Sequence, residues 1–196
     1  MSLPHALLGL IRYQPATGYD LKNTFGKSIH FFWNAALPHI YRTLKQMEGQ
    51  GWITSTVEHQ DGKPSRKVYQ VTKVGEKELL RWLAEPTEMP EPRQQLLVKV
   101  FFGNQMPPDQ FKNHLREWRA HHLGLIKKYE EEVLPTIQHC STVPGSSDEA
   151  YYWGLTLDFG RRQARMVVDW CDRALKDLEK VKGKKRKKLV RQDLQE

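Results

Sequence analysis

The side chains best suited to chemistry lie on one face of a helix that the sequence predicts between residues 37 and 50. Four apolar residues recur there at helical spacing and predict its buried stripe: Leu37, Ile40, Leu44 and Met47. The polar side chains of Arg42, Lys45 and Gln46 then point outward. Arginine can donate two hydrogen bonds to a guanine edge, glutamine can pair with adenine, and lysine suits a phosphate. Such a face is typical of a helix that reads double-stranded DNA.

A second group of cations lies at the tip of a predicted β-hairpin. Residues 52–58 are rich in β-branched side chains, residues 66–71 alternate polar and apolar, and the loop between them contains an Asp-Gly dipeptide. This arrangement places Lys63, Arg66 and Lys67 around the tip. Because each phosphate that a cation neutralises releases counterions, these side chains are candidates for contacts to the DNA backbone or a neighbouring minor groove.

The elements around these cations predict a small helical domain. Apolar spacing predicts a helix over residues 3–12, and Thr17 followed three residues later by Asp20 is a capping box that opens a second helix. Thr72 can cap a fourth helix after the hairpin. The expected buried side of that helix carries Leu79, Leu80 and Leu83. Three helices, a basic hairpin and a fourth helix form the pattern of a winged-helix DNA-binding domain, expected over residues 1–84.

A stretch rich in proline and glutamate, residues 85–92, predicts a linker, and residues 93–181 then form a helical second domain. Apolar residues recur three and four apart in both of its long helices, as in a coiled coil. The last helix carries two adjoining apolar stripes and so needs two partners, one of which we expect to be a second copy of the chain. The predicted fold class is mainly α with a small β-hairpin: an N-terminal winged helix-turn-helix and a C-terminal, coiled-coil-like helical dimerisation domain.

Large aromatic residues of the second domain can line a pocket for a small-molecule effector or fill the core and the dimer interface, and both interpretations stay open. They are Phe101, Phe102, Trp118, Trp153 and Trp170. His114, His121 and His122 have no acid or cysteine at matching spacing, so we expect no metal site. No nucleophile elbow, phosphate-binding glycine loop or paired catalytic carboxylates is found, which argues against an enzyme and a bound cofactor.

Charge and composition bound the remaining possibilities. The net charge is +8; residues 1–84 hold 11 basic and 6 acidic side chains, and residues 180–196 hold 8 and 2. We therefore expect a basic, disordered tail over residues 182–196, whose role the sequence leaves open.

The lack of a long apolar run predicts no membrane span, and only two cysteines favour a cytoplasmic protein. Charged residues four apart in the last helix predict surface ion pairs: Asp158 with Arg162, and Arg165 with Asp169.

Short segments in a fixed order resemble the PadR family of transcriptional regulators. They are Leu7–Leu10, Gly18–Leu21, Phe32-Trp33, Ile40–Glu48, Gly51–Ile53, Arg66–Thr72 and Gly75, followed more loosely by Leu96–Gly103 and the two long helices. The resemblance implies a homodimeric repressor that binds a pseudo-palindromic operator and is released by a small molecule. It also favours a phosphate contact for Tyr41, which lies at the margin of the outward face. Tyr19 and Tyr69 are expected to pack. The alternative is a winged-helix ligand-binding or protein-interaction adaptor without specific DNA binding.

Overall fold

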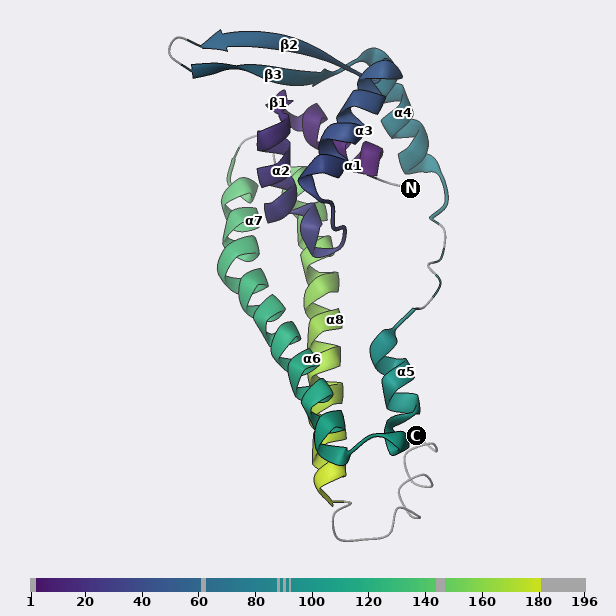
Figure 1. Ribbon diagram of the computed structural model, residues 1–196. Coiled ribbons are helices and arrows are strands. Elements are labelled where there is room, and N and C mark those ends of the chain that lie inside the picture. The colour runs from purple at the N-terminus through teal and green to yellow at the C-terminus, as the bar shows by residue number, and fades with distance from the viewer. Residues whose placement is uncertain are drawn as a thin grey trace. The chain divides into compact units, whose positions relative to one another are not determined.

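The computed structural model describes residues 3–60, 63–87, 89, 91, 93–143 and 147–180. The chain divides into two compact units, residues 1–90 and residues 91–196, and each is described by itself (Figure 1). The predicted basic tail, residues 182–196, lies outside the described residues.

In its described part, the first unit contains the helices α1 (Leu3–Tyr13), α2 (Gly18–Lys27), α3 (Leu37–Gly49) and α4 (Lys73–Ala84), with a 3-10 turn at Ile29–Phe31. The predicted capping box of α2 is confirmed. Thr17 Oγ1 accepts a hydrogen bond from the Asp20 backbone N–H at 3.1 Å, and the Asp20 carboxylate accepts one from the Thr17 backbone N–H at 3.1 Å. The Thr17 hydroxyl also donates to the Asp20 carboxylate at 2.7 Å, and this bond, together with the one from the Thr17 N–H, lowers the pKa of Asp20 below its usual range. The helices meet at a core in which Leu7, Leu8 and Leu44 are fully buried.

The hairpin predicted from the sequence is confirmed and is longer than expected. It consists of β2 (Ile53–Gln60) and β3 (Lys63–Val71), which extend together beyond the helices of this unit (Figure 1). A two-residue strand, β1 (Ala16–Thr17), joins the outer side of β3, so the antiparallel sheet has the order β1-β3-β2. No sequence pattern predicted β1, because two residues are too few to show periodicity.

Helix α4 is rotated relative to the prediction. Leu79 is buried, but Leu80 and Leu83 are 58% and 62% exposed, and Trp82 packs against the core instead. The cause is Gly75, one turn before Leu79. A Cβ on Gly75 would lie 2.1 Å from the Trp52 carbonyl oxygen, so the backbone of α4 approaches the turn before β2 too closely for any side chain.

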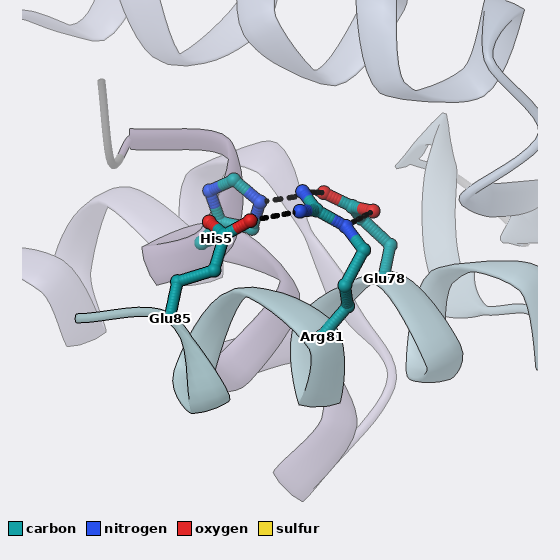
Figure 2. A network of polar contacts seen from close by, with 4 residues as sticks. All are labelled: His5, Glu78, Arg81 and Glu85. Carbon is teal, nitrogen blue, oxygen red and sulfur yellow. Dashed lines mark hydrogen bonds and ion pairs between the residues drawn. The ribbon is translucent and has the colours of Figure 1, made fainter.

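A polar network also fixes α4 against α1 (Figure 2). His5 lies 9% exposed, stacks on Trp82 with ring centroids 4.6 Å apart, and places Nε2 at 3.0 Å from Glu78 Oε1. Arg81 donates to Glu78 at 2.7 Å and 2.8 Å, and it also binds Glu85. The hydrogen bonds from Arg81 and His5 hold the pKa of Glu78 at about 2.

In its described part, the second unit contains α5 (Gln95–Phe101), a 3-10 turn at Gly103–Gln105, α6 (Pro108–Lys128), α7 (Leu134–Ser141) and α8 (Ser147–Lys180). A π-helical turn, Tyr129–Val133, joins α6 to α7. Although a proline often ends a helix, the helical run that begins with α6 continues past Pro135 to Ser141. Pro135 has no N–H to donate to the fourth residue before it, and that residue lies within the wider π turn, which accommodates the missing bond.

Helix α8 packs along α6 and α7 through the predicted seam, with Leu157, Ala164 and Cys171 buried. Four large apolar side chains of α8 are left 51–69% exposed: Tyr152, Leu155, Phe159 and Met166. At 3.6 residues per turn these four, the open face of α8, lie about half a turn from the buried seam. No helix among the residues that the structure describes is both long and apolar enough to span a bilayer.

The ion pairs of α8 match the sequence only in part. Arg162 donates to Asp158 at 2.7 Å, as predicted. The predicted pair of Arg165 with Asp169 is wrong, because Arg165 binds Glu130 of the π turn at 3.2 Å, beside Arg161 at 3.3 Å. Packing of α8 against a neighbouring element offers an acid that spacing along one helix does not reveal.

We predict that Glu78→Gln lowers the free energy of unfolding of the first unit by about 1.5 kcal/mol at neutral pH, since a charged acceptor is lost. The pKa of Glu78 is about 2 in the folded chain, against an ordinary value of 4.5. The difference between wild type and variant is therefore full above about pH 5 and shrinks as the pH falls toward 2. Urea unfolding at several pH values measures it, with Glu85→Gln, at an exposed carboxylate, as the control. A difference that stays constant across the acid range would contradict this role of Glu78.

Candidate nucleic-acid interface

The outward face of α3 is as the sequence predicts. Ile40, Leu44 and Met47 are at most 1% exposed and hold the helix on the core, whereas Leu37 is partly exposed. Three polar side chains project from the opposite side and are exposed: Arg42, Lys45 and Gln46. Among the described residues, neither Arg42 nor Lys45 takes part in an ion pair. These two cations are therefore available to an anionic or base-edge partner.

Tyr41 lies where α3 meets the start of α2. Its ring rests on Gly18 so closely that a Cβ on that glycine would lie 2.3 Å from Tyr41 Cε1. Tyr41 is 46% exposed and Tyr69 is 6% exposed, and burial raises the pKa of Tyr69. Tyr19, which the sequence predicted to pack, is instead 60% exposed on the surface of α2.

These tyrosines border a shallow depression of about 390 Å³ at the base of the hairpin. Its lining residues come from the start of α2, from α3 and from β3: Thr17, Gly18, Tyr19, Asp20, Tyr41, Ser65, Arg66, Lys67 and Tyr69. The fold thus brings Tyr41 of the predicted reading helix together with two of the predicted hairpin cations. A depression with phenol hydroxyls, an ammonium and a guanidinium on its walls offers donors to a phosphate.

Two of the hairpin cations, Arg66 and Lys67, are already paired within the protein, which the sequence did not predict. Lys67 Nζ donates to Glu48 Oε2 at 2.7 Å, and Ser55 Oγ donates to the other oxygen of the same carboxylate at 2.5 Å. These bonds lower the pKa of Glu48 and raise the pKa of Lys67. Arg66 donates to Glu58 on the facing strand at 2.7 Å.

For two residues the sequence prediction and the described geometry do not coincide: Lys63 and Glu48. The side chain of Lys63 lies outside the described part of the chain. Glu48 was missed as a functional candidate, although one signal was available. It is an acid in the last turn of a helix, where the macrodipole disfavours negative charge, so an acid there calls for a cationic partner.

The five aromatic candidates of the second unit do not form one pocket within the described residues. Phe101 is 81% exposed, with the Phe102 ring edge-on at 5.0 Å. Trp118 stacks on His122 at 5.2 Å, beside a hollow of about 430 Å³ lined by Glu117, Trp118, His121 and His122. Trp153 and Trp170 are partly buried on α8. Across the described ranges, no three potential metal ligands come together.

A winged helix with an exposed, cation-bearing third helix and a basic hairpin defines the class of DNA-binding transcriptional regulators. Models of two families match the chain: the transcriptional regulator PadR-like family over residues 7–81 and the virulence activator alpha C-terminal domain over residues 92–179. The chain is 30% identical over 189 residues to the probable transcriptional regulator Rv1176c of Mycobacterium tuberculosis, covering 91% of this chain and 98% of that protein. It therefore belongs to the PadR-like family of transcriptional regulators.

Two further relatives share this architecture. The negative transcriptional regulator PadR of Bacillus subtilis is 30% identical over 183 residues, covering 91% of this chain and 98% of PadR. Its crystal structure in complex with operator DNA has a TM-score of 0.77 to this chain at 23% identity, and a structure in complex with p-coumaric acid has 0.71. The Vibrio cholerae virulence activator AphA has a TM-score of 0.75 at 26% identity, covering 92% of this chain and 99% of AphA.

We predict that Gly18→Ala weakens DNA binding without unfolding the protein. The added methyl group displaces the Tyr41 ring, which can rotate into solvent. Loss of one hydrogen bond to a phosphate should then cost about threefold to tenfold in affinity, for every DNA sequence alike. Fluorescence anisotropy measures this, with Gly26→Ala as the control, because a Cβ on Gly26 of the same helix meets nothing within 4 Å. Wild-type affinity in Gly18→Ala would show that the position of Tyr41 does not matter for binding.

Proposed function

We propose that the chain is a homodimeric repressor that binds a pseudo-palindromic operator in double-stranded DNA and is released by a small molecule. The observation that carries this proposal is the exposed face of α3, whose rotation is fixed by the buried stripe beneath it. Family membership supports regulation of transcription, and we assign no catalytic role to the chain. We place the protein in the cytoplasm, where DNA is accessible to it.

In this proposal α3 lies in the major groove. Arg42 donates to a guanine edge, Gln46 pairs with adenine, and Lys45 meets a phosphate. The hairpin follows the backbone beside the groove, with Lys63, Arg66 and Lys67 as its cations, and Tyr41 donates to a phosphate from the depression at the hairpin base. A structure of the Bacillus subtilis relative, which shares this fold, is in complex with operator DNA, and this supports DNA as the partner.

A second copy of the chain covers the open face of α8. Those four apolar side chains form an exposed apolar patch, and such patches on proteins usually mark sites of interaction. The exposed Phe101 and Phe102 add to the apolar area. A symmetric pair would hold two α3 helices about one turn of B-DNA apart, ~34 Å, which matches a two-fold operator.

The proposed effector is a small molecule that binds against Trp118, one of the five aromatic candidates of the second unit, in the hollow that this side chain lines. The structure of the Bacillus subtilis relative with p-coumaric acid supports an aromatic ligand. The stacked Trp118 and His122 offer a flat apolar surface with polar neighbours for such a ring. An effector releases DNA only if it binds one arrangement of the dimer more tightly than the other.

We predict different effects for two variants on α3. Arg42→Ala should cost ~1–3 kcal/mol at the operator and little on other DNA, because it removes a base contact. Lys45→Ala, the matched control, should weaken binding to all sequences alike and reduce the slope of log K against log salt by about one. Anisotropy titrations on a selected duplex and on its scrambled counterpart measure both effects. Equal losses on the two duplexes for Arg42→Ala would remove its base-reading role.

We predict that Phe159→Glu breaks the homodimer, since it buries a charge in the open face of α8. Sedimentation at micromolar concentration should show a monomer that keeps the helix content of wild type, and operator affinity should fall with dimerisation. Gln138→Glu, which adds the same charge to an exposed position of α7, should remain dimeric. A Phe159→Glu protein that sediments like wild type would place the dimer interface elsewhere.

A further inference from the structure

Glu48 joins the reading helix to both strands of the hairpin. Its carboxylate lies in the last turn of α3, where the helix dipole disfavours it, and takes one hydrogen bond from Ser55 of β2 and one from Lys67 of β3. The Glu48 and Lys67 side chains are 31% and 44% exposed, so water and anions reach the pair. Exposed ion pairs are weak and exchange partners readily.

Lys67 therefore has two acceptors of the same kind within reach. A carboxylate and a phosphodiester both accept charge-assisted hydrogen bonds from an ammonium group. Inside the protein the acceptor is Glu48. Outside it lies the depression at the hairpin base, where Lys67 Nζ stands 5.2 Å from the centre of the Tyr69 ring and beside Tyr41. A phosphate bound in that depression would compete with Glu48 for the same ammonium.

The second ion pair of the hairpin has a different geometry. Glu58 and Arg66 lie directly opposite each other on β2 and β3, so this pair moves with the hairpin as a whole. The pair of Glu48 with Lys67 instead connects α3 to the hairpin. Exchange at Lys67 thus depends on how α3 is seated on DNA, and exchange at Arg66 does not.

We propose that Glu48 lowers the preference of the protein for its operator: Lys67 must leave Glu48 before it can bind a DNA phosphate, and this cost falls on the operator complex, where the base contacts of α3 bring a phosphate within reach. This inference rests on the proposed function. On unmatched DNA, Lys67 stays with Glu48, and the carboxylate adds a negative charge near the backbone. On the operator, Lys67 transfers to a phosphate and releases one more set of counterions, so the salt dependence is steeper there by about 0.9.

The test uses two duplexes: the tightest binder that the full-length protein selects from a random pool, and its scrambled counterpart. In anisotropy titrations from about 0.05 to 0.3 M NaCl, Glu48→Gln should gain about fivefold in affinity for the selected duplex, because the pair with Lys67 no longer has to break. Its salt slope on that duplex should stay as in wild type, since Lys67 binds a phosphate in both proteins. Affinity for the scrambled duplex should change by less than about twofold, so the specificity ratio should rise about threefold.

Two controls separate this role from net charge. Glu58→Gln makes the same chemical change on the hairpin and should leave the specificity ratio unchanged. Glu48→Gln combined with Lys67→Gln should have the ratio of Lys67→Gln alone, because Glu48 acts through Lys67. Equal gains on both duplexes, a higher ratio in Glu58→Gln, or a double variant whose ratio differs from that of Lys67→Gln would each overturn the proposal.

Lys67→Gln alone gives an independent test should Glu48→Gln not fold, which thermal unfolding reports. It should lower the salt slope on the selected duplex by about 0.9 and leave the slope on the scrambled duplex unchanged. Equal lowering on both overturns the role of Glu48. If wild type shows no preference for any selected duplex, the proposed function fails together with this inference. A clear preference with an unchanged ratio in Glu48→Gln overturns the inference alone.

Discussion

The rotation of α3 about its own axis is the constraint on which the rest of the first unit depends. Ile40, Leu44 and Met47 are at most 1% exposed, and burying each such side chain stabilises the fold by about 1.5–3 kcal/mol. Any other rotation would return these side chains to water. The same rotation presents Arg42 outward and brings Glu48 against the hairpin. Burial of the apolar stripe of α3 therefore determines both the core and the proposed reading surface.

The first unit uses carboxylates in two contrasting ways. Glu78 lies close to the core between His5 and Arg81, and its pKa of about 2 marks a charge that the folded state stabilises strongly. Glu48 makes a comparable set of hydrogen bonds at the surface, where a partner can be exchanged. The two carboxylates therefore differ in what they join: Glu78 connects α1 to α4, whereas Glu48 connects the proposed reading helix to the hairpin.

Local patterns in the sequence predicted most of the fold and the composition of the candidate site. The Thr17 capping box, the buried stripe of α3 and the hairpin each depend on residues close in sequence, and each is confirmed. The difference in α4 arises from distant backbone, because its close approach to Trp52 turns Leu80 outward. The difference at Pro135 is local, because a π turn carries the helix past this residue. Spacing alone could not pair Lys67 with Glu48, because the two lie on different elements.

Two contacts of the first unit join residues far apart in the chain: Ala16 pairs with Tyr69 on β3, and His5 binds Glu78 on α4. The second of these contacts can form only after Glu78 has left the ribosome. At that moment α8, which carries the open face, has not been translated. Since domains fold as units from the N-terminus during synthesis, the winged helix of each nascent chain is complete before the surface that would recruit a second copy exists. Assembly thus joins finished modules, and a defect in the first unit precedes any encounter between chains.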